Sequence, residues 1–408
     1  MEKLLQQDID DLGYLHSFSD EELKVLENVD KAVEELSVSE LECYLKREVN
    51  LEGPKIAKKY GLQRIPIKKE YGGLGMPPLV STLAKMRCGQ LGLGFSSYLN
   101  VQLFLTEMTL QRWGSDEQRA KYLKPAVDGD SILAFGLTEP DVGSNPASMK
   151  TSFESKGGSY VINGTKYLIT NGERANAVIV FAREKGNPDG GITAFLVDTK
   201  SEGFSVAMEL REKMGLFTSD TAMLEFDNLE VSEENVLGPR GKGLHVAYSA
   251  LLNGRLGIAA GCVGIIEGCL NAVLDRARER VQFGKPIGKH QLIQKHIAEI
   301  RQNLEMARWP TYFAAVRKAE YEKDMDNREL LAEMDLRASL AKKIASRFAF
   351  ESADHAVQVF GGFGYSLLSP VGRLFCDSRV TRIYEGSDEI QELKIASSLL
   401  GKGFEAFE

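Results

Sequence analysis

The chain has 408 residues, of which 43% are hydrophobic and 26% charged, and its formal net charge is -8. This composition is that of a globular protein with a substantial buried core, and it excludes disordered and collagen-like chains. The longest apolar run, residues 256–266, is interrupted by glycines and is far shorter than the roughly 20 residues of a membrane-spanning helix, so we expect no membrane segment. The acidic total also argues against a nucleic-acid partner.

The residues that usually bind metals are scattered along this chain. Its five cysteines and five histidines show neither metal-ligand spacing nor the pattern of a disulfide framework, so we expect no metal site. The first residues, 1–11, lack the features of a secretory signal and of an organelle transit peptide. The cytoplasm is therefore the expected location.

The first part of the chain is predicted to be helical. Apolar residues recur at helical spacing over residues 19–60, 79–86 and 98–113, and Ser115 has the surroundings of a helix start. A loop rich in glycine and proline, residues 65–78, separates the first two stretches. We assign residues 1–130 to a helical N-terminal domain.

Short runs rich in β-branched and aromatic residues follow, separated by turn residues. These runs cover residues 131–137, 160–162, 167–169, 177–182, 192–197, 204–207 and 222–226. Asn163-Gly164 is predicted to be a turn between two of them. Residues 131–240 are therefore expected to form a compact antiparallel sheet, a small β-barrel.

Helical patterns return after the glycine-rich segment 237–243 and continue to Leu400, so residues 241–408 form a third, helical domain. The predicted fold class is α+β, in the order helical, β, helical. The glycines Gly361, Gly362 and Gly364 do not follow a predicted strand, which makes a Rossmann dinucleotide site a weak interpretation.

A carboxylate stands out near the C-terminus, in the stretch Tyr384-Glu385-Gly386-Ser387. Apolar spacing resumes at Ile390, so Ser387 is expected to cap a helix and Glu385 to lie on the loop before it. Two interpretations of Glu385 remain open on this pattern alone: a solvated acid in a capping turn, or a functional carboxylate.

Six separated motifs give the sequence a resemblance to the acyl-CoA dehydrogenase family along nearly its whole length. The motifs, in the family's order, are Leu137-Thr138-Glu139-Pro140 with Gly143-Ser144, Asn163-Gly164-x-Lys166 with Ile169-Thr170-Asn171-Gly172, Lys213-Met214-Gly215 with Ser219, Arg280-x-x-Phe283-Gly284-Lys285-Pro286 with Gln291, Gln358-x-x-Gly361-Gly362-x-Gly364, and Ile383-Tyr384-Glu385-Gly386. Each is modest evidence, but six in register are specific.

The resemblance implies a helical N-terminal domain, a middle β-domain and a C-terminal four-helix bundle. It also implies FAD, held between the last two domains and reaching a neighbouring subunit of a homodimer or homotetramer. The expected activity is α,β-dehydrogenation of an acyl thioester, either an acyl-CoA or an acyl group on a carrier protein, in which a carboxylate removes the α-proton and flavin N5 accepts the β-hydride.

The resemblance assigns the catalytic base to Glu385, whose backbone N–H would bind the thioester oxygen together with a ribityl hydroxyl of FAD. A subgroup of the family carries its base just before the arginine matched by Arg255, but that position is Gly254 here. Substrate contacts are expected from Ser144, Arg255, Tyr384 and Gly386. Bulky side chains of Phe95, Tyr98 and Leu99 are expected to line the acyl tunnel and favour a short acyl group.

The expected FAD contacts form three groups by position in the chain. Those around the isoalloxazine are Phe135, Leu137, Thr138, Gly143, Ser144, Leu168 and Thr170. Those that reach the FAD of a partner subunit or its adenine and pyrophosphate are Arg280, Gln282, Phe283, Gln291, Gln358, Gly361 and Gly362. Ser387 and Glu389 follow the base and are expected to meet the dinucleotide part.

The sequence departs from the family pattern at Leu168, where many members carry a tryptophan packed against the flavin. This leaves the electron acceptor open between electron-transferring flavoprotein and molecular oxygen, as in an oxidase or monooxygenase on the same fold. Other departures suggest a divergent branch that acts on carrier-bound acyl groups in secondary metabolism. A non-catalytic, DNA-binding relative would need a basic face, which the net charge disfavours.

Overall fold

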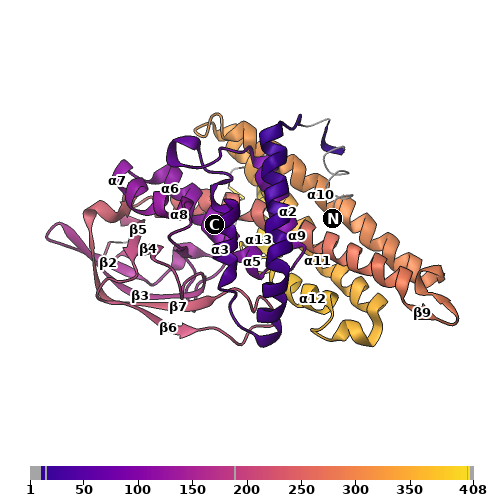
Figure 1. The fold of residues 1–408 in the computed structure, drawn as a ribbon. Coiled ribbons are helices and arrows are strands. Elements are labelled where there is room, and N and C mark those ends of the chain that lie inside the picture. The colour runs from indigo at the N-terminus through magenta and orange to yellow at the C-terminus, as the bar shows by residue number, and fades with distance from the viewer. Residues whose placement is uncertain (1–10, 14–15, 188–189, 402, 405–408) are drawn as a thin grey trace.

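The computed structural model describes residues 11–13, 16–187, 190–401 and 403–404. The expectation of a cytoplasmic location rests on the N-terminal residues, and residues 1–10 lie outside this set. The described chain has the predicted order of helices, sheet and helices, with the sheet at one end of the molecule and the longest helices at the other (Figure 1).

The first block contains helices of very different lengths. They are α2 (Asp20–Lys46), α3 (Glu52–Tyr60), α4 (Pro78–Gly89), α5 (Gly94–Leu99), the π-helical η3 (Asn100–Glu107), α6 (Met108–Trp113), α7 (Asp116–Gln118), the π-helical η4 (Arg119–Leu123) and α8 (Lys124–Val127). Ser19 caps α2 and Ser115 caps α7, each in a reciprocal capping box that satisfies free backbone N–H groups. The predicted start at Ser115 is thus confirmed.

The middle block is an eight-stranded sheet. Its strands are β1 (Leu133–Gly136), β2 (Ser152–Lys156), β3 (Ser159–Thr170), β4 (Ala177–Glu184), β5 (Ile192–Asp198), β6 (Phe204–Glu209), β7 (Thr221–Ser232) and β8 (Val236–Leu237). Their order is β6-β7-β3-β2-β4-β5-β8, with β1 beside β4. Most pairs are antiparallel as predicted, but β1 and β2 each run parallel to β4. Whether two strands pair in parallel depends on how the chain connects them in space. The lengths of the predicted apolar runs do not reveal those connections.

Two details of the sheet differ from the prediction. Asn163-Gly164 is not a turn, because β3 continues through it with a shift in its pairing to β7. Gly164 has φ +143°, and a Cβ there would lie 2.7 Å from the Cα of Thr151. The strand therefore passes so close to Thr151 that this position of the bulge requires glycine. β2 was not predicted because Phe153 is its one apolar residue.

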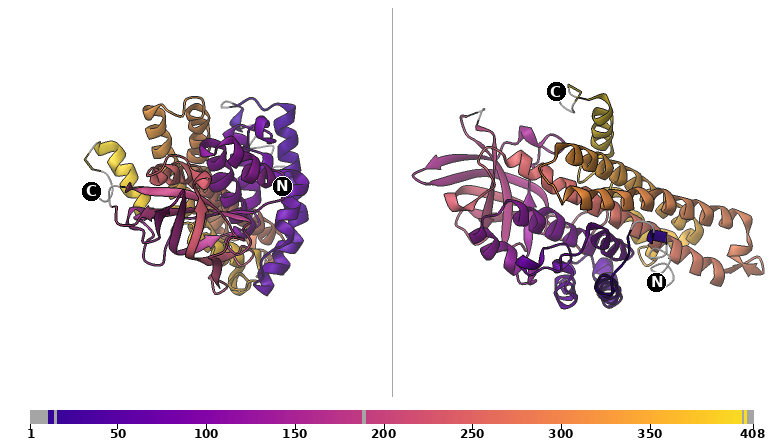
Figure 2. Two further views of the ribbon diagram at one scale, coloured as in Figure 1. Left: turned by 90° about the vertical axis from the view of Figure 1, so that its left-hand side faces the viewer. Right: turned by 90° about the horizontal axis from the view of Figure 1, so that it is seen from above.

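The last block consists of α9 (Gly243–Glu279), α10 (Gln291–Tyr321), α11 (Arg328–Phe360), α12 (Pro370–Val380) and α13 (Asp388–Leu400). A small hairpin, β9 (Val281–Gln282) with β10 (Lys285–Pro286), joins α9 to α10 at the far end of the molecule (Figure 1). Short 3-10 turns complete the chain: η1 (Leu62–Arg64), η2 (Lys69–Tyr71), η5 (Pro146–Ser148), η7 (Glu233–Asn235), η8 (Ile287–Lys289) and η9 (Gly361–Tyr365). α13 projects from the body of the chain (Figure 2).

The long helix α9 is the centre of the fold. By length and composition it could span a membrane, but 83% of its most apolar stretch is buried inside the protein, as in the core helix of a globular domain. α4 crosses it so closely that a Cβ on Gly264 would lie 2.1 Å from the carbonyl oxygen of Met86. Small residues on α9 therefore let the first and last blocks pack backbone to backbone.

Candidate functional site

Glu385 lies on the short loop between α12 and α13. Glu385 and Gly386 have φ values of +55° and +85°, so the chain reverses through two consecutive left-handed residues. Ser387 caps α13 by accepting a hydrogen bond from the N–H of Ile390, as predicted. Gln391 Nε2 donates to the carbonyl oxygens of Glu385 at 3.2 Å and Gly386 at 3.0 Å. The backbone that carries the carboxylate is thus held from α13.

Glu385 borders a cleft of about 120 Å³ that receives side chains from all three blocks. The first block contributes Ser97, Asn100, Val101 and Leu105; the sheet contributes Phe135, Leu137, Thr138, Leu168, Ile169 and Thr170; the last block contributes Leu251, Ile258, Tyr384 and Glu385. The cleft is mostly apolar with a few polar groups, which is the usual character of a small-molecule site.

The environment of Glu385 is that of a base near neutrality. Burial raises the pKa of its carboxyl to about 7, against the opposing influence of the positive charges of Arg255, Lys342 and Lys85 and of a hydrogen bond from Asn100. Asn100 Nδ2 donates to Oε1 at 3.2 Å, whereas Oε2 is shielded from solvent and has no hydrogen-bond partner in the described chain. An unpartnered carboxylate oxygen in a cleft is suited to accept a proton.

Gly254 of α9 lies directly beside this carboxylate. A Cβ at Gly254 would be 2.5 Å from Oε2 of Glu385, closer than two such atoms can approach. The position at which the resemblance puts an alternative base therefore adjoins Glu385, and only a residue without a side chain leaves room there for the carboxylate.

The two threonines expected to contact a flavin both line the cleft. Neither hydroxyl, of Thr138 or of Thr170, makes a hydrogen bond to another described residue, so both can serve a ligand. Leu168 lines the cleft as well; it has φ +58° and its side chain is 50% exposed. Phe135 and Leu137 are buried in the cleft wall.

Other predicted contacts do not line the cleft. Gly143 and Ser144 are exposed on the loop after β1. Arg255 is buried and donates to Asp335 Oδ1 at 2.6 Å and to Ser339 Oγ at 2.7 Å. Glu389 is exposed in the first turn of α13.

The remaining predicted cofactor contacts lie together at the far end of the bundle. They lie at the end of α9 and in the hairpin that follows it (Arg280, Gln282, Phe283), at the start of α10 (Gln291), and at the end of α11 and in η9 (Gln358, Gly361, Gly362), and all are exposed. Phe283 is 93% exposed. None of them lines the cleft of Glu385.

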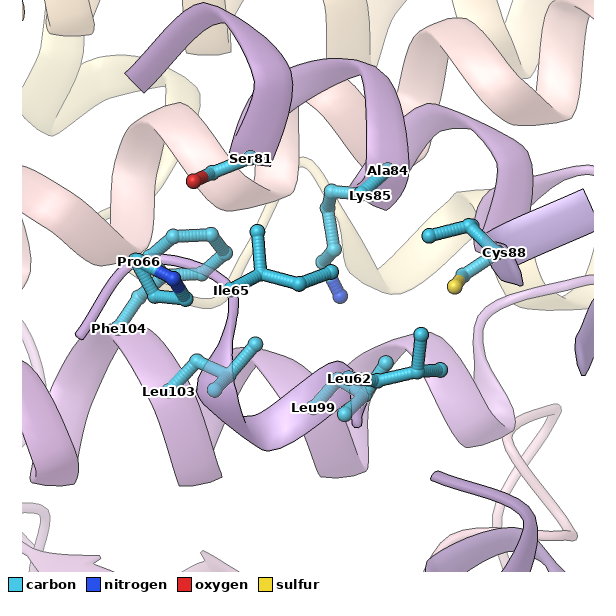
Figure 3. Close-up of a pocket in the computed structure, with 11 residues that line it drawn as sticks. Leu62, Ile65, Pro66, Ser81, Ala84, Lys85, Cys88, Leu99, Leu103 and Phe104 are labelled. Carbon is cyan, nitrogen blue, oxygen red and sulfur yellow. The ribbon is translucent and has the colours of Figure 1, made fainter. Parts of the chain in front are cut away.

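The expected acyl-tunnel residues are also displaced. Phe95 and Tyr98 line a separate pocket with Asn171, and Leu99 lines a third pocket beside Lys85 (Figure 3). None of the three lines the cleft of Glu385, so their expected place along the acyl tunnel stays a prediction. Among described residues no cluster of three or more His, Cys, Asp or Glu could hold a metal ion.

Two site residues were not foreseen from the sequence. Asn100 stands in the apolar run from Leu99 to Leu105, and Lys342 stands among alanines in α11, where it is buried and donates to the carbonyl oxygen of Gly386 at 2.7 Å. A polar residue among mostly apolar or small helical neighbours marks each position as unusual, but it does not show what the side chain contacts.

Comparison with known proteins identifies the family of the chain. Three family models match in succession: acyl-CoA dehydrogenase, N-terminal domain, at residues 19–130; middle domain, at 134–229; and C-terminal domain, at 241–400. An acyl-CoA dehydrogenase of Bacillus subtilis is 41% identical over 346 residues, which is 84% of this chain and 88% of the relative.

Two solved structures illustrate the range of similar folds. The butyryl-CoA dehydrogenase of Megasphaera elsdenii has a TM-score of 0.88 and 33% identity, and the match covers 95% of this chain and 100% of that one. The prolyl acyl carrier protein oxidase AnaB has a TM-score of 0.86 and 28% identity, and the match covers 94% of this chain and 100% of that one. The chain therefore belongs to the acyl-CoA dehydrogenase family, whose members are FAD-dependent oxidoreductases that act on CH–CH bonds.

Proposed function

We propose that this protein is an FAD-dependent acyl-thioester dehydrogenase in which Glu385 removes the α-proton of the substrate. The observation that carries the proposal is Oε2 of Glu385, which has no hydrogen-bond partner among the described residues and belongs to a cleft also lined by Thr138 and Thr170. The residue proposed as proton acceptor and the residues proposed to bind the flavin therefore line one mostly apolar cleft.

The residues around the cleft suit FAD by their chemistry. Thr138 and Thr170 offer unpaired hydroxyls for a polar ring edge, while Phe135, Leu137 and Leu168 offer apolar surface. When bound, FAD supplies the acceptor for the β-hydride. The chain's own residues must bind the thioester, exclude water and move the α-proton.

The α-hydrogen of a thioester is only weakly acidic, so its removal requires stabilisation of the developing negative charge on the carbonyl oxygen. The backbone N–H of Glu385 makes no hydrogen bond to another described residue and is available for that oxygen. One residue would therefore provide the proton acceptor through its side chain and a hydrogen-bond donor through its backbone.

The test is anaerobic mixing of the FAD-loaded protein with a panel of short acyl-CoAs and the same acyl groups on an acyl carrier protein. We expect the flavin absorbance to bleach and an α,β-unsaturated thioester to form with at least one carrier. Failure of every saturated acyl thioester to bleach a correctly loaded flavin would contradict the proposal.

A carrier-protein substrate is the second candidate, and the similarity to the oxidase AnaB favours it. It predicts faster bleaching by acyl carrier proteins than by the matching acyl-CoAs. Equal or faster reaction of the acyl-CoAs would instead favour an acyl-CoA substrate.

The electron acceptor is the remaining choice within this function. Leu168 is half exposed at the cleft, and leucine lacks the aromatic face that the resemblance expects at this position. Slow reoxidation of the reduced enzyme in air, together with fast reoxidation by electron-transferring flavoprotein, would indicate a dehydrogenase. Fast reoxidation in air would indicate an oxidase.

A further inference from the structure

Asn100 makes the one side-chain hydrogen bond to the Glu385 carboxylate among the described residues. Its Nδ2 lies 3.2 Å from Glu385 Oε1 and 3.5 Å from the carbonyl oxygen of Gly254. Because both partners are acceptors, the amide must present its nitrogen to them. Asn100 is only 1% exposed, so water does not compete for these contacts.

The local helix geometry explains why this side chain reaches the base. Asn100 is the first residue of the π-helical segment η3, directly after the α-helical turn of α5. A π-turn is wider than an α-turn and re-aims the side chains that follow it, and such turns are frequent at functional sites. Every residue of η3 is buried, so its register is fixed by packing.

Two glycines on α9 accommodate the pair. A Cβ at Gly254 would lie 2.5 Å from Glu385 Oε2, and a Cβ at Gly257 would lie 2.1 Å from Asn100 Oδ1. Positions three residues apart in a helix share one face. The carboxylate and the amide therefore lie side by side over a surface from which both side chains are missing.

We propose that Asn100 is a positioning residue for the base: it holds Oε1 of Glu385 so that Oε2 stays free and directed to the substrate. This inference rests on the proposed function, because it assigns a role within the proton-transfer step. With Asn100 in place one carboxylate oxygen is anchored; without it neither oxygen has a side-chain donor in the described chain.

The charged groups that surround Glu385 cannot replace this contact. Arg255 of α9 is engaged with Asp335 and Ser339, and Lys342 of α11 is engaged with the Gly386 carbonyl. Lys85 of α4 points into a separate apolar pocket (Figure 3), where its amine bonds Ser96 Oγ at 2.7 Å. These three cations act on Glu385 through space, whereas Asn100 fixes its geometry.

The test is the pH profile of flavin bleaching by a short acyl thioester in the FAD-loaded Asn100→Leu and Asn100→Asp variants. Leucine has a similar size but no hydrogen-bond donor. We therefore expect kcat to fall about ten-fold or more while KM changes little. The acid limb of the pH profile, which is the rise of kcat on its acidic side, should shift its midpoint up by about one pH unit. Asn100→Asp places a second carboxylate against the first and should move the limb further.

Asn303→Leu is the matched control. Asn303 is a buried asparagine of α10 that donates to Ser352 Oγ at 3.2 Å, away from the cleft. It should lower the thermal stability through the lost hydrogen bond and leave the acid limb unchanged. A shift of the acid limb of equal size in this control would show that the effect of the Asn100 substitutions comes from a general destabilisation of the fold.

A readout without turnover separates this inference from the proposed function. Infrared titration follows the carboxylic-acid band of Glu385, assigned by its absence in Glu385→Gln. An upward shift of its midpoint in Asn100→Leu supports the contact even if the substrate panel fails. An unshifted midpoint, or an unshifted acid limb with kcat within two-fold of the parent, overturns the positioning role.

Discussion

At the level of single residues, the properties of Glu385 depend on a missing side chain and on a missing hydrogen-bond donor. Glu385 can adopt its position because Gly254 has no side chain, and its Oε2 stays free because no described donor reaches it. The place of Glu385 on the loop before a capped helix was predictable from the Tyr384-Glu385-Gly386-Ser387 pattern. The contact with Asn100 was not, because an apolar helical pattern gives no sign of the π-turn that aims it.

Gly254→Ala should displace the base without disturbing the helix. The added Cβ would lie 2.5 Å from Glu385 Oε2, and a misplacement of about 1 Å can cost about 10²-fold in rate. Bleaching kinetics should show that loss while the melting temperature stays near the parent's, since alanine favours a helix. Asn253→Ala is the control: the Asn253 amide donates to the carbonyl oxygen of Ser249 and makes no other hydrogen bond among the described residues, so this variant should keep its rate.

The pH dependence of kcat should follow Glu385. Burial raises its pKa to about 7, and the carboxylate is the form that accepts a proton, so kcat should increase with pH through a midpoint of about 7. Stopped-flow bleaching between acidic and mildly alkaline pH measures this midpoint. A flat profile across neutrality would mean that another group or another step controls the rate.

The elements of the fold are held at the cleft by a few buried polar contacts. The block order, the long helices and most strands were predictable from periodicity. The bulge at Asn163-Gly164, the strand β2 and the parallel pairing to β4 were not, because each depends on contacts between segments distant in the chain. One such contact between distant segments is the 2.8 Å ion pair of Lys166 with Glu139, which joins β3 to the loop after β1.

Lys166→Met should destabilise the sheet domain. Lys166 is 0% and Glu139 3% exposed, so removal of the lysine leaves a buried carboxylate without its cation, which costs about 3–5 kcal/mol. Urea denaturation measures the change. The control is Lys150→Met, which removes the exposed pair with Asp141 and should cost less than about 1 kcal/mol.

At the scale of the whole molecule, the predicted site residues form two separate groups. One surrounds Glu385, and the other is exposed on the hairpin and the end of α11, with Phe283 93% exposed. The resemblance predicted both groups and placed most of the second at the FAD of a partner subunit, and the structure shows that the two groups are separate within one chain. We propose that a second subunit brings the distal group to the FAD of the first.

Phe283→Gln should therefore weaken both assembly and flavin retention. Light scattering should show a smaller assembly, and the ratio of flavin to protein should fall on dilution. Val38→Gln, which replaces another exposed apolar side chain on α2, should change neither. Full flavin retention by a monomeric Phe283→Gln protein would contradict the shared site.

The proton-transfer role of Glu385 is tested most directly by anaerobic bleaching of the bound flavin in the Glu385→Gln variant. Glutamine keeps the size of the side chain but cannot accept the α-proton, so we predict a loss of bleaching rate of about 10²–10⁴-fold with unchanged flavin content. Bleaching at the parent rate by the same acyl thioester would contradict the account.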